Sequence, residues 1–403
     1  REDVALVGGA VRDLLLGHWP RELDVTVAGD AAGLAREIAA SVSPGERAYG
    51  RRVEPLLHER FGTASVAWGY GRVDIAERRA ESYPAPGALP EVRPGNPEED
   101  LRRRDFTVNA IALPLHGAEN EGLISVEGAL EDLRAGVLRV LHERSFIDDP
   151  TRILRLARYA ARLGFEIEPR TRELAAEALG GGALGTVSGD RLASELWLAL
   201  RETDGQAAMR ALGELGVLGA LGLGARPPGF DGALAAEAER LLPPDGARDV
   251  LLVAVAVNGA LAEGDARFAE ALESMTRLGF SGDLRARVQS AACAELPATL
   301  SSAADAYAIF ERYPLEGVAI AGALAARSSA EAGAWVRDWL DTQRHIRLEI
   351  DGNDLIAAGV PQGPEVGIRL SVALASKRDG GVDGREQELR AALDYEIPPA
   401  VDA

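Results

Sequence analysis

One stretch, residues 7–24, constrains the fold of this chain more than any other. Its apolar start breaks at Gly8-Gly9 and is followed by apolar residues at helical spacing, Val11, Leu14 and Leu15. This pattern predicts a strand, a tight turn and a helix. Glycines at such a turn let backbone N–H groups approach an anion where the helix starts. Arg12 and Asp13 lie in the first turn of that helix, so the turn is a candidate phosphate-binding site.

Carboxylates follow in the next predicted strand. Glu22 and Asp24 are two residues apart, so both side chains leave the same face of a strand. Asp74 lies in a further strand-like segment and would complete a site for one or two Mg²⁺ ions, which prefer oxygen ligands. The alternative is that these acids simply face solvent. A phosphate-binding turn beside paired acids is what metal-assisted phosphoryl transfer requires.

A short segment, residues 101–109, combines guanidinium groups, an acid, a hydroxyl and an amide. Alternation turns Asp105 and Asn109 away from the apolar residues between them, which can point into a core. Arg103 and Arg104 could bind a triphosphate, and Asn109 could bind a ribose hydroxyl. As surface charge alone, the segment would be an ordinary loop.

The segment 148–152 allows two interpretations. Structurally, Asp149 is a suitable N-cap before a proline at the first position of a long amphipathic helix that runs through Leu163. The arginines of that helix could then be a solvated stripe: Arg152, Arg155, Arg158 and Arg162. Functionally, Asp149 and Arg152 present an acceptor beside a donor. Cytosine and adenine both show an amino donor next to a ring-nitrogen acceptor, whereas guanine and uracil show the reverse. The pair would therefore accept C and A and refuse G and U without a template.

The character of the sequence changes along the chain. Up to about residue 115, strand-like and helix-like segments alternate, with a helix expected at 31–42 and a hairpin at 64–75. This indicates an α+β head with a mixed sheet. After residue 131 the chain is rich in alanine and leucine at helical spacing, interrupted at residues 180–182, 227–229 and 243–246, and a last helical segment is expected at 346–395. A chain of 403 residues should form roughly two to four compact units.

The bulk composition argues against several classes of protein. No apolar run reaches membrane-span length, and no signal peptide is visible. A single cysteine, Cys293, excludes an intrachain disulfide and a thiolate zinc site, so a reducing, cytoplasmic setting fits. The five histidines lack metal-binding spacing, and no Walker loop or nucleophile elbow is present. A net charge of −19 argues against non-specific nucleic-acid affinity, although a local basic patch can still bind phosphates.

Taken together, these residues resemble the bacterial class II tRNA nucleotidyltransferase (CCA-adding) and poly(A) polymerase family, within the polymerase β-like nucleotidyltransferases. The resemblance runs in order along essentially the whole chain and is most specific in residues 1–165. The motifs that carry it are G-G-A-V-R-D-L-L-L-G at 8–17, E-L-D at 22–24, H-E-R-F-G-T at 58–63, E-E-D-L-R-R-R-D-F-T-V-N-A at 98–110, S-F-I-D-D-P-T-R-I-L-R at 145–155, V-S-G-D-R-L-A-S-E-L at 187–196 and G-N-D-L-I-A-A-G-V-P-Q-G-P at 352–364.

The resemblance implies a catalytic head followed by three all-α parts: head 1–140, base-recognising neck 141–200, body 201–340 and tRNA-binding tail 341–403. It also implies roles for individual residues. The triphosphate would contact Gly8, Gly9, Arg12 and Asp13, and Mg²⁺ would be held by Glu22 and Asp24, joined by Asp74. The nucleotide would be positioned by Arg103, Arg104, Asp105, Asn109, Asp149, Arg152, Arg155 and Arg158, while Arg191 and Glu195 fall in the 187–196 motif.

The implied activity is that of a cytoplasmic, Mg²⁺-dependent transferase. It would add CMP and AMP from CTP and ATP to the 3′ end of tRNA, complete the CCA sequence and release pyrophosphate. Neither a membrane nor a particular oligomeric state is implied. A-only addition, CC-only addition and poly(A) polymerisation share the same motifs and stay open, as does a non-catalytic tRNA-binding protein. An oxidoreductase interpretation of Gly8-Gly9 is weaker, because no acidic ribose ligand or further glycine spacing supports it.

Two positions and one segment depart from the family pattern. Glu22 stands where the family usually has the first aspartate of D-x-D, and Asp148 where it usually has glutamate. The segment 125–129, Ser-Val-Glu-Gly-Ala, replaces an Asp-Pro-Phe-Gly-Gly type of loop. In the family that loop helps to switch from C to A addition, so this departure bears on which nucleotides are added.

Overall fold

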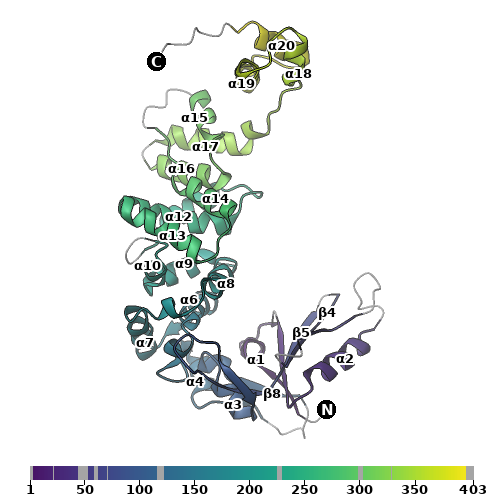
Figure 1. The fold of residues 1–403 in the computed structure, drawn as a ribbon, viewed down its shortest axis with the longest axis vertical. Helices are drawn as coiled ribbons and strands as arrows, with labels where there is room; N and C mark the ends of the chain where they lie inside the picture. The colour runs from purple at the N-terminus through teal and green to yellow at the C-terminus, as the bar shows by residue number, and fades with distance from the viewer. Residues whose placement is uncertain are drawn as a thin grey trace. The chain divides into compact units, whose positions relative to one another are not determined.

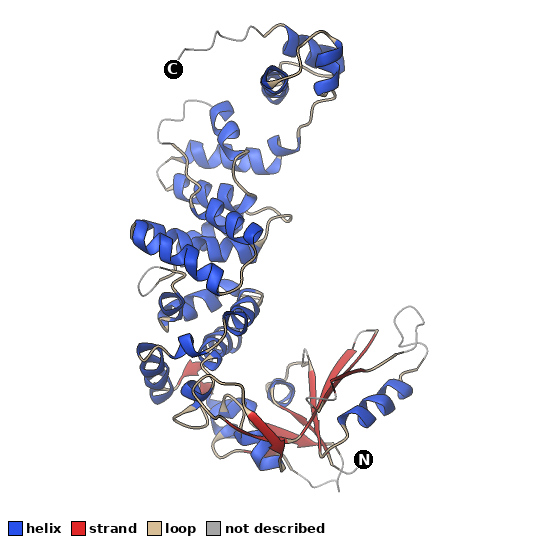
Figure 2. Cartoon of the chain, viewed as in Figure 1, coloured by secondary structure: helices blue, strands red, loops and turns tan. Residues whose placement is uncertain are grey.

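The computed structural model describes residues 3–20, 22–43, 53–58, 62–69, 71–115, 122–224, 229–297, 303–327 and 329–395. The described chain divides into two compact units, Arg1–Phe230 with Glu263–Phe280, and Asp231–Ala262 with Ser281–Ala403. Strands lie in the first unit, and the second is built from helices (Figures 1 and 2). The finer division into head, neck, body and tail stays a prediction.

Within the described residues, one mixed sheet of seven strands forms the base of the first unit. Its spatial order is β3-β4-β5-β2-β1-β8-β9, in which β2 and β5 are parallel and the other pairs antiparallel. The expected α+β head with a mixed sheet is therefore confirmed. The strands are β1 (Val4–Val7), β2 (Leu23–Val27), β3 (Leu56–His58), β4 (Thr63–Trp68), β5 (Gly71–Glu77), β8 (Ile111–Pro114) and β9 (Ile124–Ser125).

The local sequence explains these elements. Strand β1 pairs on both sides and all four of its residues are buried, which suits its uninterrupted apolar sequence. The expected hairpin at 64–75 is the antiparallel pair β4–β5. Helix α2 (Ala31–Ser41) matches the helix expected at 31–42, and the Asp30 carboxylate caps it by accepting from the Gly33 N–H at 2.9 Å. Helix α1 (Gly9–Leu15) follows the glycine turn after β1.

Short elements connect the sheet to the helices that follow. Strand β6 (Arg79–Ser82) pairs with β7 (Glu91–Pro94), and β10 (Val137–Leu138) pairs with β11 (Glu166–Ile167). The connecting helices are α3 (Pro97–Arg102), the 3₁₀ turn η4 (Thr107–Asn109), α4 (Ala129–Ala135) and α5 (Ser145–Asp148).

Helix α6 (Thr151–Leu163) begins one residue later than the sequence suggests, because its first turn is closed by i+3 rather than i+4 hydrogen bonds. The first unit also contains α7 (Pro169–Gly180), η5 (Ala183–Thr186), α8 (Gly189–Leu200), α9 (Gly205–Glu214), α10 (Val217–Leu221) and α13 (Asp265–Arg277). As expected, residues 180–182 end a helix. Residues 227 and 228, and residues 59–61 of the 58–63 motif, lie outside the described part of the chain.

The second unit is helical, as expected. Its elements are α11 (Gly232–Leu241), α12 (Arg248–Ala262), α14 (Gly282–Ala292), α15 (Ala303–Phe310), α16 (Leu315–Ala326), α17 (Ala330–Asp341), η6 (Gln343–His345), α18 (Gly352–Ala357), α19 (Pro364–Arg378) and α20 (Arg385–Leu393). The break expected at 243–246 separates α11 from α12.

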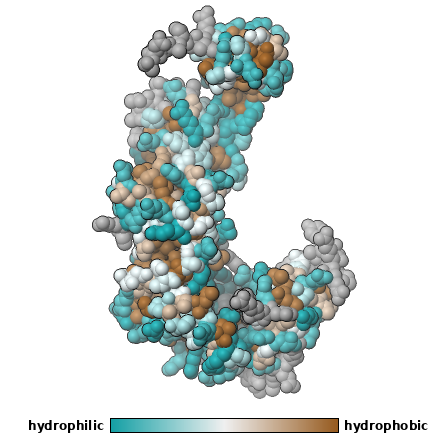
Figure 3. Space-filling view, viewed as in Figure 1, coloured by the Kyte–Doolittle hydropathy of each residue, from teal (hydrophilic) through white to brown (hydrophobic). Residues whose placement is uncertain are grey.

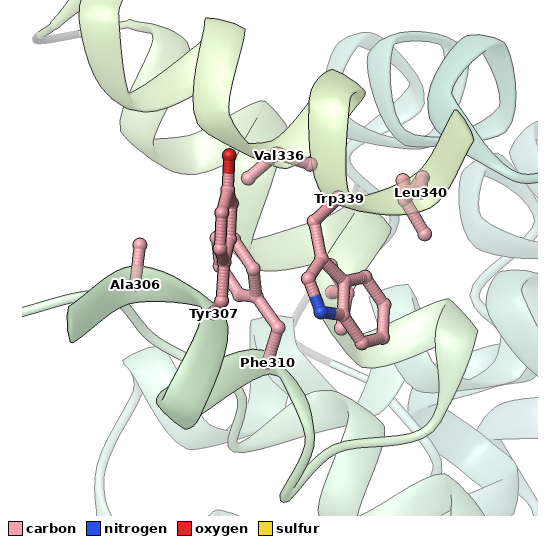
Figure 4. Packing of buried hydrophobic residues seen from close by; sticks show 7 residues of the cluster. Ala306, Tyr307, Phe310, Val336, Trp339 and Leu340 are labelled. Atoms are coloured by element: carbon pink, nitrogen blue, oxygen red, sulfur yellow. The ribbon is translucent and has the colours of Figure 1, made fainter. Parts of the chain in front are cut away.

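Two buried clusters stabilise the second unit. In the first, the Phe310 ring meets the Trp339 ring edge-on with centroids 5.6 Å apart, beside Tyr307 and Val336 (Figure 4). The second holds α18, α19 and α20 together around the fully buried Leu355. Such packing provides most of the stability of short helices.

Hydrophobic and hydrophilic residues are interspersed on the surface shown in Figure 3. Hydrophobic residues lie in separate patches among hydrophilic ones on the face shown in Figure 3. None of the helices in the described ranges has the length and apolar character needed to cross a membrane.

Candidate active site

The glycine turn between β1 and α1 places backbone at the edge of a cavity. Gly8 has a φ of +68°, and a Cβ built on it would lie 2.7 Å from Arg104 Nη1. Only glycine avoids this contact and accepts this backbone conformation without strain. The sequence therefore folds so that the guanidinium of Arg104 lies directly against the turn.

Neighbouring parallel strands bring two predicted metal-binding acids together. Asp24 on β2 and Asp74 on β5 are direct partners in the register, and the preceding Glu22 is exposed. Burial raises the pKa of Asp24; Arg104 opposes this shift, while Glu22 and Asp74 add to it. Asp24 therefore sits among like charges, an environment that favours a bound cation.

Asp74 is partly engaged by the protein. Its Oδ1 accepts a hydrogen bond from the Ser65 hydroxyl and forms an ion pair with Arg72 at 3.0 Å. Among the residues described, no group of three or more acidic, histidine or cysteine side chains is arranged to hold a metal ion. The carboxylates of Glu22 and Asp24 border one cavity, and their oxygen atoms are the kind of ligand that Mg²⁺ prefers. A role for Asp74 as a third ligand stays a prediction.

Two buried acids orient the predicted triphosphate-binding arginines. Asp100, 2% exposed, accepts from Arg103 Nη2 at 2.8 Å and from Arg104 Nη2 at 3.0 Å. Burial alone would raise the pKa of Asp100, but the two guanidinium groups hold it below its usual value. Arg103 also donates to Glu81 at 3.1 Å, whereas the buried Arg104 Nε has no partner in the described residues. The hydrogen bond of Arg104 to Asp100 uses Nη2, so Nη1, which lies against the glycine turn, keeps donor capacity for an anion.

A buried chain of hydrogen bonds fixes the amide of Asn109. Arg12 Nη1 donates to Asn109 Oδ1 at 2.6 Å, and Asn109 Nδ2 donates to Asp105 Oδ1 at 3.0 Å. Arg12 is 1% exposed and also donates to Asp13 Oδ1 from Nε at 2.8 Å. In this structure Arg12 therefore contacts Asn109 and Asp13, and its predicted contact with a triphosphate stays a prediction.

Helix α6 supplies a row of arginines around one tyrosine. Arg155 donates to Asp105 Oδ2 at 2.7 Å, and Arg158 Nη2 donates to Glu195 at 3.3 Å. Guanidinium carbons of Arg12, Arg155 and Arg158 lie 5.3, 5.6 and 4.8 Å from the centroid of the Tyr159 ring, within the range of cation–π contact. The Arg155–Asp105 bond ties α6 to the strand-rich part of the unit, and the Arg158–Glu195 bond ties it to α8.

The two predicted base-reading residues are both anchored. Asp149 Oδ1 accepts from Thr151 Oγ1 at 2.7 Å and from Arg191 Nη2 at 2.9 Å. Arg152 donates to Ser145 Oγ at 2.8 Å and to the Arg103 carbonyl at 2.7 Å.

One cavity of about 510 Å³ brings most of the predicted residues together. Those at its lining are Gly8, Gly9, Asp24, Arg103, Arg104, Asp105, Asn109, Asp149, Arg152 and Arg155. A second cavity of about 430 Å³ is lined by Arg12, Asp13, Glu22 and Arg158, and again by Gly9, Asp24 and Arg155. Asp24 borders both cavities, and Asp74 borders neither.

Several residues of the first cavity were not among the candidate site residues from sequence: Glu81, Tyr83, Tyr159, Arg191 and Glu195. A signal existed for Tyr159, which follows Arg152 and Arg155 at helical spacing (i, i+3, i+7) on one face. Arg191 and Glu195 lie in a motif of the family resemblance but had no assigned role. Glu81 and Tyr83 carry no local pattern, because their proximity comes from the β6–β7 pair.

Comparisons with known proteins identify related sequences and structures. The model of the Poly A polymerase head domain matches residues 4–139. A CC-adding tRNA nucleotidyltransferase of Deinococcus radiodurans is 34% identical over 98% of this chain and 89% of its own length. The chain belongs to the tRNA nucleotidyltransferase family. An A-adding tRNA nucleotidyltransferase of Aquifex aeolicus is 44% identical, but over 49% of this chain and 23% of its own length. This family member spans a quarter to a half of the A-adding relatives matched first.

Solved structures of the family share the fold. A CCA-adding enzyme in an apo form has a TM-score of 0.79 at 28% identity, covering 97% of this chain and 91% of that one. The Thermotoga maritima CCA-adding enzyme complexed with tRNA has a TM-score of 0.73 at 28% identity, covering 97% and 90%. A CCA-adding enzyme complexed with CTP has a TM-score of 0.76 at 27% identity, covering 98% and 92%.

Proposed function

We propose that this chain adds C, C and A from CTP and ATP to the 3′ end of tRNA without a template, releasing pyrophosphate. The observation that carries the proposal is the 510 Å³ cavity, where the glycine turn, Asp24, the two arginines after α3, and the Asp149–Arg152 pair meet. Groups for phosphate binding, metal binding and base reading are thus within reach of one nucleotide. The names of the relatives support tRNA as acceptor.

The chain's own groups would hold the nucleotide in line for transfer. Backbone N–H groups of the glycine turn and the guanidinium of Arg104 would bind the triphosphate. Arg103 is held beside it by Asp100 and Glu81, and the fixed amide of Asn109 would meet the ribose. Because these donors are already oriented, little reorganisation is needed when charge develops on the phosphates.

Glu22 and Asp24 would hold Mg²⁺. When bound, Mg²⁺ supplies Lewis-acid activation of the attacking 3′-hydroxyl and neutralises charge on the departing pyrophosphate. One of these carboxylates, or solvent, would take the proton of that hydroxyl.

Base selection would come from Asp149 and Arg152. The carboxylate accepts the amino group of cytosine or adenine, and the guanidinium donates to the adjacent ring nitrogen. Guanine and uracil would place a carbonyl oxygen against the carboxylate, which costs free energy by repulsion and by the lost hydrogen bond.

Other activities of the family remain the alternatives. The full-length relative is a CC-adding enzyme, the more identical partial match is an A-adding one, and the 125–129 segment departs from the family loop. In this structure the segment leads from β9 into Gly128, which has a φ of +77° before α4, and Val126 N–H donates to the Ala110 carbonyl next to Asn109.

The test uses purified protein, Mg²⁺ and labelled CTP or ATP, separately and together. The acceptors are tRNA ending at the discriminator base, after C, and after CC. Addition of three nucleotides to the first acceptor, followed by a halt, is the predicted result. A stop after CC, or ATP use on the CC-ended tRNA alone, would assign CC-adding or A-adding activity, and long A tails on unrelated RNA would assign poly(A) polymerisation. No incorporation, with tRNA still bound, would indicate a non-catalytic tRNA-binding protein.

A further inference from the structure

We propose that Arg191 of α8 is a positioning residue for base selection. Together with Thr151, it holds one oxygen of the Asp149 carboxylate and leaves the other oxygen to the base. This inference rests on the proposed function and adds to it a residue outside the base-reading pair.

In the part of the chain that the structure describes, the hydrogen bonds to Asp149 reach one of its two carboxylate oxygens. Its Oδ1 accepts from Thr151 N–H at 3.2 Å, Thr151 Oγ1 at 2.7 Å and Arg191 Nη2 at 2.9 Å. Within the described part of the chain, the hydrogen bonds to this carboxylate all end on Oδ1. Its Oδ2 thus keeps its lone pairs for a ligand in the cavity that Asp149 borders.

Arg191 is itself held at its other end. Its Nη1 donates to the Gly87 carbonyl at 3.1 Å. Gly87 has a φ of +68°, and a Cβ there would lie 2.1 Å from Thr186 Oγ1, while its N–H donates to the Ile147 carbonyl at 3.1 Å. Gly87 is held by its hydrogen bond to Ile147, and a larger residue would not fit beside Thr186. The guanidinium of Arg191 therefore has two anchored contacts, Gly87 and Asp149.

Arg152 is fixed in a parallel way. Its Nη1 donates to Ser145 Oγ, and its Nη2 donates to the Arg103 carbonyl. Nη2 also donates to the Tyr83 hydroxyl at 3.4 Å, so Nε and one hydrogen on Nη1 remain as donors. An acceptor and a donor are therefore presented at defined places, which is the condition for reading the edge of a base.

Discrimination depends on the carboxylate staying in place. Guanine or uracil is refused because its carbonyl oxygen would face Asp149 Oδ2. A carboxylate freed from Arg191 can rotate away from that oxygen or let water enter between them. Losing Arg191 should thus relax selectivity, while an ordinary structural ion pair would change stability alone.

The experiment compares wild type, Arg191→Ala, Arg191→Lys and Thr151→Val, with Arg210→Ala as a matched control on an exposed residue of α9. Two quantities are measured: the association constants of CTP, UTP, ATP and GTP by calorimetry, and the incorporation rates, of CTP and UTP into tRNA lacking CCA and of ATP and GTP into tRNA ending in CC. We expect R191A to lower the CTP/UTP and ATP/GTP ratios by about tenfold, the scale of one charge-assisted hydrogen bond. R191K should restore part of each ratio, since it keeps a charged donor.

Thr151→Val keeps the shape of the side chain, so it tests the idea even if R191A folds poorly. It should lower the same ratios by a smaller factor, and R210A should leave them unchanged. Unchanged ratios in both R191A and T151V, or an equal weakening of all four nucleotides, would overturn the inference. A wild-type protein that incorporates nothing contradicts the proposed function instead, and the ratios of association constants then still decide the role of Arg191.

Discussion

Asp105 is the residue on which the buried hydrogen bonds of the site converge. Its Oδ1 accepts from the Phe106 N–H at 2.8 Å and from Asn109, and its Oδ2 accepts from Arg155. Burial alone would raise the pKa of Asp105, but Arg155 and Asn109 lower it to about 2. The ionised form is therefore part of the folded state.

This pKa predicts a pH-dependent contribution to stability. The folded-state value lies below the usual 3.8, so ionised Asp105 stabilises the fold at neutral pH, and this stability is lost as pH falls from about 4 toward 2. Asp105→Asn should cost about 2 kcal/mol at pH 7. Urea unfolding of both proteins from pH 7 to 3 measures the difference, which should shrink below pH 4. A difference independent of pH would contradict the assignment.

Asp24 is predicted to be required for chemistry rather than for RNA binding. Asp24→Ala should lower the rate of CMP incorporation by at least about 100-fold, because metal-assisted transfer contributes several kcal/mol. Chelation of divalent ions by EDTA should stop the wild-type reaction. Filter binding should show tRNA affinity within about twofold of wild type, given that the substitution removes no RNA-binding cation. Full activity in D24A would exclude this carboxylate from catalysis.

Residues differ in how far their environment follows from sequence. Asp149 and Arg152 lie one helical turn apart, so local geometry predicts that they face one cavity, as they do. The partners of Arg12 could not be predicted, since Asn109 reaches it only through the pairing of β1 with β8. The engagement of Asp74 by Ser65 likewise depends on the β4–β5 register.

At the scale of elements, α6 joins the base-reading residues to the strand-rich part of the unit. Its Arg155 pairs with Asp105 at 2.7 Å, and its Arg162 pairs with Asp13 at 3.2 Å. Both acids lie in segments adjoining the sheet. Through these two ion pairs, α6 holds the base-reading residue Arg152 in place relative to the sheet.

A double-mutant cycle tests this support. Arg155→Met alone leaves the Asp105 carboxylate, 6% exposed, without its charge partner, and should destabilise the unit by roughly 3–5 kcal/mol. Combined with Asp105→Asn, the loss should be smaller than the sum of the single losses by about 2 kcal/mol. Thermal unfolding of the four proteins gives the coupling energy. Additive losses would mean that the two side chains do not stabilise each other.

Elements with a strong local pattern were predictable from the sequence. The helix at 31–42, the hairpin at 64–75 and the long helix after Asp149 are present. The parallel pairing of β2 with β5, which aligns Asp24 with Asp74, has no local signal because it joins segments about fifty residues apart.

At the scale of the whole molecule, the chain is two compact units, and the candidate site lies within the first. Phe310 of the second unit is fully buried against Trp339. Phe310→Ala should destabilise the second unit by about 3–5 kcal/mol, because it opens a cavity in that core. Calorimetric CTP affinity should stay within twofold of wild type at a temperature where both units are folded. A tenfold loss of CTP affinity would show that the nucleotide site depends on that core.

The central claim is that one cavity both selects the base and transfers the nucleotide. The most direct measurement is the incorporation of each of the four labelled nucleotides, supplied singly with Mg²⁺, into tRNA lacking CCA and into tRNA ending in CC. The predicted result is C on the first acceptor and A on the second, each preferred over G and U by at least about 100-fold, as expected for a site that hydrogen-bonds the base edge. Equal incorporation of all four nucleotides, or none while tRNA remains bound, would contradict the account.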